Sequence, residues 1–138
     1  DIASALQMGA DLAYMGTRFI NTKESLADEG YKNMIINSTA DDIIYTAVVS
    51  GVKANFIKQS LEAMGITEDD WSKTKKINFG EELDAAKAEA KAWKTIWSAG
   101  QGVTSIKDCP SVSKLISDLK SEFIDSIKEQ SQLLENFK

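Results

Sequence analysis

The chain of 138 residues carries 21 acidic and 16 basic side chains, which gives a formal net charge of −5. This acidic balance argues against a nucleic-acid-binding surface, which requires a basic stripe. No apolar run approaches the roughly 18 residues that a membrane span requires, so we expect neither a nucleic acid nor a membrane as partner.

The first third of the chain predicts a helix, a buried strand and a second helix. Residues 1–9 are expected to form the first helix, which ends at Gly9, because glycine suits the left-handed conformation that closes helices. Residues 12–15 are an uncharged apolar run, which is typical of a parallel strand buried on both faces. The second helix covers about 23–38 and breaks at Asn37–Asp41. Its apolar side consists of Leu26, Ala27, Tyr31, Met34 and Ile35.

The middle of the chain predicts a strand, a short helix and a polar loop. Residues 43–49 are β-branched and aromatic, which favours a strand. Residues 54–64 are expected to form a short helix that Gly65 closes. The polar stretch 67–79 is interpreted as a loop. Its apolar anchors are Trp71 and Ile77.

Two long helices are predicted in the last third. The first covers 81–98 and stops before the Gly-Gln-Gly sequence at 100–102. Its apolar stripe is Leu83, Ala86, Ala90, Trp93 and Trp97. The last helix follows the only proline and is capped by Ser111 or Asp108, with residues 128–138 polar enough to fray. Its inner face is Val112, Leu115, Ile116, Leu119, Phe123, Ile127 and Leu134.

Two turns could contribute to a binding site. At Gly16-Thr17, a glycine and a small hydroxyl residue after a strand would let backbone N–H groups approach an anion. Alternatively, Gly16 only permits a turn and Thr17 caps the next segment. Gln101, between two glycines, could place an amide that donates and accepts hydrogen bonds in a site. Alternatively, those glycines only end the helix.

The composition limits the chemistry that these turns could support. The sequence has no histidine, the commonest general base and metal ligand near neutral pH. Its only cysteine, Cys109, excludes an intramolecular disulfide and suits a reducing cytoplasm. We therefore assign no catalytic residue and no metal ligand within the chain.

Several segments, taken in order, resemble nitronate monooxygenases, formerly called 2-nitropropane dioxygenases. The sequence ALQMGADLAYMGTRF at 5–19 is similar to the family's last barrel helix and strand. Tyr31-Lys32 occurs where the family often has a Tyr-Lys pair, and 45–54 resembles its segment ending in Gly-x-x-Ala. The Trp-Ser-Ala-Gly-Gln-Gly-Val sequence at 97–103 resembles its Ala-Gly-Gln region. The stretch 67–92 shows no resemblance.

This resemblance implies that the mainly α chain is the C-terminal part of a TIM-barrel flavoprotein with a mostly helical inserted second domain. Residues 1–24 would be the last helix and strand of the barrel. Residues 25–95 would be the substrate-side domain. Residues 96–138 would hold the Ala-Gly-Gln loop and a helix that returns to the barrel.

The family binds FMN and oxidises alkyl nitronates with dioxygen. By analogy, the FMN phosphate would lie at Gly16 and Thr17. The implied cofactor-binding residues are Tyr14, Met15, Gly16, Thr17 and Gln101. The family's usual catalytic histidine lies in the part of the barrel that precedes this segment, and the chain has no histidine. We therefore expect the chain to be inactive alone and not to bind FMN stably.

Two alternatives remain open. FMN-dependent enoyl-acyl-carrier-protein reductases share a similar Met-Gly-Thr-Arg-Phe and Ala-Gly-Gln arrangement. The chain could also be a free-standing helical interaction domain whose aromatic stripe binds a partner helix. In either case an apolar strand at 12–15 without neighbours exposes its edges. We therefore expect the isolated chain to self-associate, or this segment to pack in a rearranged way.

Overall fold

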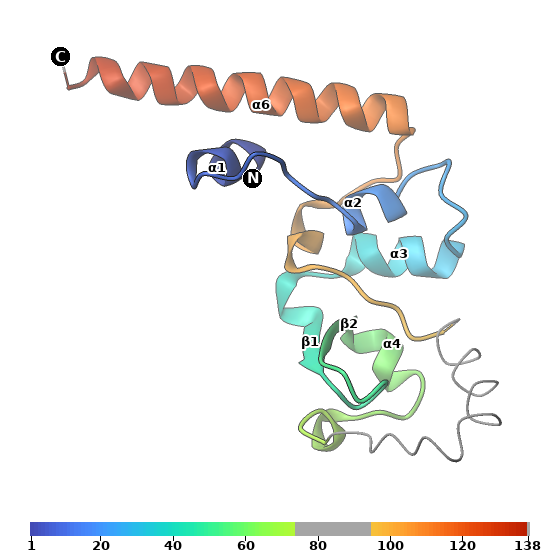
Figure 1. Ribbon diagram of the computed structural model, residues 1–138. Helices are drawn as coiled ribbons and strands as arrows, with labels where there is room; N and C mark the ends of the chain where they lie inside the picture. The colour runs from blue at the N-terminus through green and yellow to red at the C-terminus, as the bar shows by residue number, and fades with distance from the viewer. Residues whose placement is uncertain (74–94, 138) are drawn as a thin grey trace. The chain divides into compact units, whose positions relative to one another are not determined.

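The computed structural model describes residues 1–73 and 95–137 (Figure 1). The chain divides into two compact units. The terminal unit combines Asp1–Leu26 with Cys109–Lys138, and the central unit is Ala27–Asp108. The predicted segments end at residues 24 and 95, whereas the compact units divide after Leu26 and Asp108.

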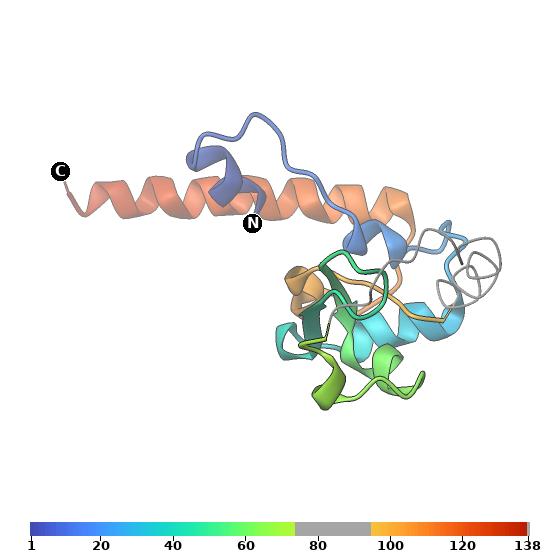
Figure 2. The ribbon, with the colours of Figure 1, turned by 60° about the horizontal axis from the view of Figure 1, so that its bottom comes forward.

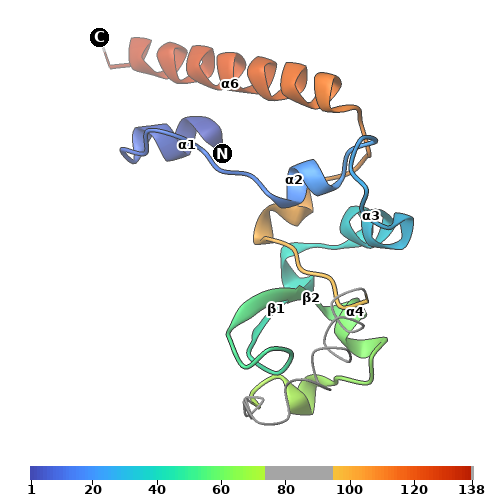
Figure 3. The same ribbon diagram turned by 45° about the vertical axis from the view of Figure 1, so that its right-hand side comes forward.

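The terminal unit consists of three helices: α1 (Ile2–Gln7), α2 (Thr17–Ile20) and α6 (Val112–Glu135). Helix α1 lies beside α6 (Figures 1 and 3). It ends as predicted, with Gly9 at a φ of +93°. Helix α6 packs through Leu115, which is fully buried. These contacts fold the two ends of the chain into one unit.

The predicted strand at 12–15 is wrong, because this segment is an extended coil that leads into α2. Leu12 and Tyr14 are 87% and 99% exposed. A parallel strand needs at least one neighbouring strand with which to form hydrogen bonds. Among the described residues the only sheet is a two-stranded one in the central unit, so this segment has no strand to pair with.

Helix α6 begins as predicted but extends further than predicted. The Ser111 hydroxyl caps it by accepting the N–H of Lys114 at 3.2 Å. The predicted fraying from residue 128 is wrong, since the helix is continuous to Glu135 (Figure 2). Its last turns contain Lys, Glu, Gln and Leu and no glycine or proline, and these residues favour helix even where they face water.

The central unit begins with helix α3 (Glu29–Asn37), which is shorter than the predicted 23–38. Asp28 caps it, since its Oδ1 accepts the N–H of Gly30 at 2.7 Å. The expected helix over 23–27 is wrong, because the N–H of Lys23 instead donates to the carbonyl of Pro110 at 3.0 Å. Ile35 is the predicted apolar residue of α3 that is fully buried.

A β-hairpin supplies the sheet of the central unit (Figure 3). After the short η1 helix (Ala40–Asp42), β1 (Ile43–Thr46) pairs with β2 (Ala54–Ile57) in antiparallel register. The first strand is a shortened form of the predicted one. Assigning residues 54–57 to a helix is wrong, because the antiparallel partner is only a turn away.

The helix predicted after this strand is present as α4 (Lys58–Glu62), and Gly65 closes it with a φ of +76°. Strand β2 and helix α4 bury Phe56, Ile57 and Leu61 completely. The core cluster is Val49, Phe56, Leu61 and Ile96. The core therefore joins a hairpin, a helix and a segment almost forty residues later in the chain.

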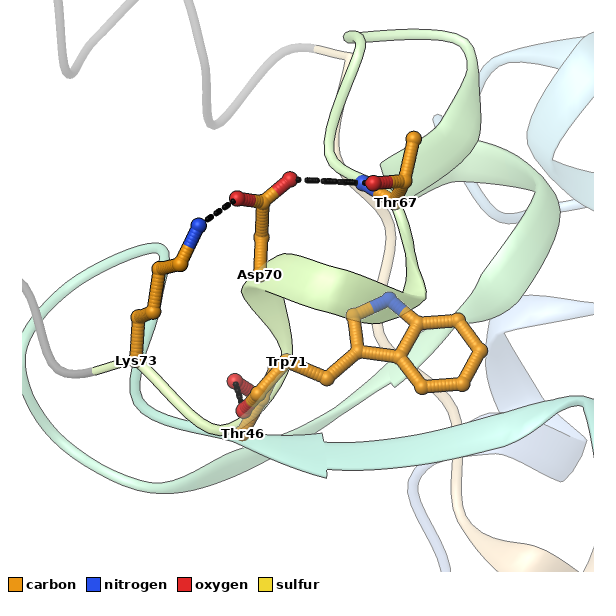
Figure 4. A network of polar contacts seen from close by, with 5 residues as sticks. All are labelled: Thr46, Thr67, Asp70, Trp71 and Lys73. Atoms are coloured by element: carbon orange, nitrogen blue, oxygen red, sulfur yellow. Dashed lines mark hydrogen bonds and ion pairs between the residues drawn. The ribbon is translucent and has the colours of Figure 1, made fainter.

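The predicted loop after α4 contains the short η2 helix (Glu68–Asp70) and is anchored by Trp71, as expected (Figure 4). Asp70 accepts the N–H of Thr67 at 3.0 Å and pairs with Lys73 at 2.6 Å. The Thr46 hydroxyl donates to the Trp71 carbonyl at 2.7 Å, which ties the loop to β1.

The next predicted elements are only partly within the described residues. Ile77 and residues 81–94 of the predicted helix lie outside them. Residues 95–98 are not helical, so the predicted end of that helix is wrong. A short η3 helix (Gln101–Ser105) follows. No helix in the described part of the chain is both long and apolar enough to span a membrane.

Candidate functional site

The predicted phosphate turn lies where the coil of the terminal unit enters α2. Gly16 is the N-cap of α2 with φ −101° and ψ −68°, a conformation open to any residue. Its carbonyl accepts the N–H groups of Phe19 and Ile20 at 3.0 and 3.1 Å. A Cβ atom at Gly16 would meet nothing within 4 Å. Within the described residues, the space above Gly16 is therefore open to an approaching group.

The four residues of this turn differ in exposure. Tyr14 and Gly16 are exposed, whereas Met15 and Thr17 are half-buried. Met15 lines an open apolar groove of about 430 Å³ between α1, the coil and α6. Phe19 and Phe123 line it as well, and Lys120 is its only charged side chain. Met15 therefore anchors the turn to the protein, while Tyr14 and Gly16 face outward.

Gln101, the other predicted cofactor residue, is exposed at the start of η3 in the central unit. The backbone after it is held firmly. Val103 and Ile106 are buried, and the N–H of Val103 donates to the carbonyl of Gly100 at 3.0 Å. The Thr104 hydroxyl accepts the N–H of Ala40 at 2.7 Å.

The backbone before Gln101 is held by hydrogen bonds to Ser60 and β2. The Trp97 carbonyl accepts the N–H of Ile57 at 2.8 Å. The buried Ser60 hydroxyl accepts the Trp97 N–H at 3.0 Å and lies 3.2 Å from the Trp97 carbonyl. The segment before the turn is therefore fastened to the end of β2 and the start of α4.

Tyr31 contacts the same segment from α3. Its ring stacks on the indole of Trp97, with centroids 5.2 Å apart and planes 12° from parallel. Its hydroxyl donates a hydrogen bond to the carbonyl of Ser98. A Cβ atom at Gly30 would lie 3.1 Å from Cη2 of Trp97, so α3 approaches this indole closely.

In the sequence, Tyr31 stands out only as part of an apolar face and of a family-like pair, and Ser60 carries no signal. No local pattern distinguishes a buried serine whose partner lies 37 residues later. Trp97 was assigned to a helical stripe, whereas its ring faces α3. Its stacking on Tyr31 depends on the tertiary fold and cannot be inferred from the spacing of apolar residues along the sequence.

Two ionisable groups of the central unit have shifted pKa values. Burial raises the pKa of Tyr31 above its ordinary value, against the opposing effect of its bond to Ser98. The pKa of Asp42 is lowered, chiefly because its carboxylate accepts the backbone N–H of Thr39. In the described ranges no three carboxylate or thiol groups gather in a way that could hold a metal ion.

The two halves of the predicted cofactor site belong to different units. Tyr14, Met15, Gly16 and Thr17 are in the terminal unit, and Gln101 is in the central unit. Each half has its own structural support. The turn at Gly16 offers open space at a helix start, and the Gln101 turn offers an exposed amide on a tightly held backbone.

Comparison with known proteins assigns the family. A model of the nitronate monooxygenase family matches residues 1–122. The nitronate monooxygenase of Paraburkholderia phytofirmans (strain DSM 17436 / LMG 22146 / PsJN) is 31% identical over 137 residues. That alignment covers 95% of this chain and 37% of the relative. The chain therefore belongs to the nitronate monooxygenase family of oxidoreductases, as its sequence motifs indicate, and spans little more than a third of that relative.

Solved structures give a similar result for the fold. FabK from Thermotoga maritima has a TM-score of 0.66 at 21% identity, covering 94% of this chain and 42% of that protein. Its M276A mutant has a TM-score of 0.67 at 24% identity, covering 95% and 39%. At these identities the likeness concerns the fold alone. It covers both units of the chain.

Proposed function

We propose that this chain provides the phosphate-side turn and the substrate-side region of an FMN-dependent nitronate monooxygenase. The complete enzyme would form a TIM barrel and oxidise alkyl nitronates with dioxygen. The observation that carries this proposal is the family match over residues 1–122, which includes both the Gly16 turn and the Gln101 turn. A single cysteine suits a location in the reducing cytoplasm.

In this proposal the FMN phosphate approaches the turn above Gly16. The absence of any atom within 4 Å of a Cβ there supports the approach of a bulky anion. Thr17, the first residue of α2, has a hydroxyl that can donate a hydrogen bond to a phosphate oxygen. Met15 holds the turn against the apolar groove, and Tyr14 lies on its outer side. FMN would supply the redox chemistry.

Gln101 would lie near the flavin in the complete enzyme. Its amide can donate to one polar atom and accept from another, which suits the orientation of a small polar substrate. By analogy with the family, whose usual base is a histidine in the part of the barrel before this segment, the base would come from the rest of the enzyme, since this chain has no histidine. One anion-binding turn without an enclosing cavity supports neither stable FMN binding nor catalysis by the chain alone.

The full-length protein tests this proposal directly. We expect a yellow protein that consumes oxygen with propionate 3-nitronate. A correctly folded, colourless protein would contradict the proposal. Oxidation of NAD(P)H with an enoyl thioester, without turnover of nitronates, would favour the enoyl-acyl-carrier-protein reductase instead.

A pair of variants at Gly16 tests the phosphate contact. Both Gly16→Asp and Gly16→Asn fit the open space, and both side chains are good helix N-caps. Only aspartate places a negative charge against the phosphate, so it should weaken FMN binding by about tenfold or more relative to asparagine. Equal FMN dissociation constants for the two variants would show that the phosphate does not bind at this turn.

We also propose that the isolated chain self-associates. Leu12 and Tyr14 are exposed beside the open apolar groove, and contact between copies would bury this surface. The apparent mass in light scattering should exceed the monomer mass and increase with concentration. A monodisperse monomer at all concentrations would contradict this proposal.

A further inference from the structure

The turn that carries Gln101 is preceded by a cluster of side chains that we call the Trp97 clamp. It consists of Tyr31, Ser60, Trp97 and Ser98. Ser60 binds the backbone of Trp97 from α4, with the Trp97 N–H donating to its hydroxyl at 3.0 Å. Tyr31 binds from α3, through a ring stack at 5.2 Å and a hydrogen bond to the Ser98 carbonyl. The clamp therefore holds this backbone from two helices.

The opposite end of the turn is held by different contacts. Val103 is fully buried, and the Thr104 hydroxyl accepts the N–H of Ala40 at 2.7 Å. Between these two supports Ala99 is buried as well, whereas Gln101 is exposed. A side chain that faces solvent from a backbone fixed at both ends has a restricted position, which is what an orienting group requires.

We propose that Tyr31 is a positioning residue: through Trp97 and Ser98 it holds the turn so that the Gln101 amide meets the substrate in one orientation. The inference rests on the proposed function, because it assigns Gln101 to the pocket. It adds Tyr31 of α3 to the residues that shape the site. Tyr31 acts on Gln101 through its contacts with Trp97 and Ser98.

Tyr31 suits this role better than the other members of the clamp. Its hydroxyl binds the carbonyl only three residues before Gln101, whereas Ser60 binds one residue further back and is buried. Burial raises the pKa of Tyr31, so the phenol remains protonated and keeps donating throughout the neutral range. Loss of its hydroxyl should loosen the turn without opening the core.

The test uses Tyr31→Phe in the full-length enzyme. Phenylalanine keeps the ring that stacks on Trp97 and removes only the donor to Ser98. We expect kcat to fall by about three- to tenfold, with KM and flavin content nearly unchanged, because orientation matters most in the transition state. The matched control is Tyr45→Phe, the same change at an exposed tyrosine of β1, which should leave kcat unchanged.

A double-mutant cycle separates positioning from a general effect on the fold. In a Gln101→Ala background, Tyr31→Phe should have almost no further effect on kcat, because the group it positions is gone. The same fold reduction in both backgrounds would show that Tyr31 does not act through Gln101, and would overturn the inference.

Amide hydrogen exchange tests the clamp independently of the reaction. Tyr31→Phe should speed exchange at residues 98–103 by about tenfold, whereas Tyr45→Phe should not. Unchanged exchange would overturn the inference even in an active enzyme. Faster exchange in a protein that does not oxidise nitronates would contradict the proposed function and support the action of Tyr31 on the turn.

Discussion

In the central unit, Phe56, Ile57 and Leu61 have no exposed surface, although they lie on a short hairpin and a helix of five residues. In the terminal unit, Leu12 and Tyr14 belong to an equally apolar run and are 87% and 99% exposed. The two regions thus differ in the partners that the chain provides, rather than in the apolar character of their sequences.

This difference has a topological cause. An antiparallel strand can pair with the next strand across a short turn, and β1 pairs with β2 in this way. A parallel strand needs a neighbour that is a crossover away. Residues 12–15 have no such neighbour among the described residues. Their apolar pattern, which is typical of a buried parallel strand, therefore does not lead to a strand.

The largest expected effect tests this contrast with one chemical change at two leucines. Leu61→Ala should lower the free energy of unfolding by about 2–5 kcal/mol, because it leaves a cavity in a closed core. Leu12→Ala should change it by at most about 0.5 kcal/mol, since the side chain is already exposed. Urea unfolding measures both losses, followed by tryptophan fluorescence for Leu61→Ala and by circular dichroism for Leu12→Ala.

Fluorescence reports the central unit because all three tryptophans lie in its sequence range, whereas circular dichroism reports the helices of the terminal unit, which holds Leu12. The measurement should be repeated at several protein concentrations, because self-association would bury Leu12. An equal loss of stability for the two variants at the lowest concentration would contradict the exposed position of Leu12.

A smaller effect is expected from a serine in each unit. Ser60→Ala should cost about 1–3 kcal/mol, because the buried Ser60 hydroxyl no longer accepts the N–H of the half-buried Trp97. Ser111→Ala removes the N-cap of α6 and should cost about 1 kcal/mol. Denaturant midpoints, measured by fluorescence for the first and by circular dichroism for the second, report these losses. A larger loss at Ser111 would reverse the expected order.

Elements whose signals are local could be predicted from the sequence. Gly9 and Gly65 end their helices with positive φ, and Ser111 caps α6. The signals at 12–15 and 54–57 misled because they depend on pairing. The first segment is an apolar run that has no sheet to join. The second is a short apolar segment that forms a strand because it pairs with β1 in a hairpin.

The candidate site could be predicted only in part. Gly16 and Gln101 drew attention through glycine-containing turns and through a family resemblance that the family match confirms. Their roles toward FMN remain predictions. Ser60 carried no signal, and the contact of Tyr31 with Trp97 was missed, because both depend on residues brought together from α3, α4 and the segment after residue 95.

A still smaller effect is expected at acid pH. The pKa of Asp42 is lowered by the N–H of Thr39, so its stabilising contribution is complete above its ordinary pKa and is lost as the pH falls through the lowered value. Asp42→Asn should cost at most about 1 kcal/mol at neutral pH, because solvent screens this solvent-accessible carboxylate, and less in strong acid. The matched change Asp69→Asn, at an exposed carboxylate of η2, should have little effect at either pH.

Urea unfolding of the central unit, followed by fluorescence at several pH values, measures this dependence. The Asp42 carboxylate also accepts the Gln59 amide at 2.8 Å, which links η1 to α4. A stability difference between Asp42→Asn and the unchanged chain that is independent of pH would mean that shape rather than charge is responsible.

The smallest expected effects concern ion pairs within helices, and they contrast the two units once more. Lys114 pairs with Asp118 on exposed α6, so Lys114→Gln should cost at most about 0.5 kcal/mol. Lys58 pairs with Glu62 at 3.9 Å and also lies 5.7 Å from the ring centre of Trp71. Lys58→Gln should therefore cost slightly more, by about 0.5 kcal/mol for the cation–π contact.

Salt distinguishes these two lysines. At about 1 M salt the Debye length falls to about 3 Å, so the effect of Lys114→Gln should vanish. Part of the effect of Lys58→Gln should persist, because Nζ of Lys58 also lies over the half-buried indole of Trp71, and a partly buried contact is screened less than an exposed ion pair. Thermal unfolding at low and high salt measures both variants. If the losses from both variants disappeared at high salt, Lys58 would act only as a surface charge. Its contact with the indole of Trp71 would then not add to the stability of the central unit.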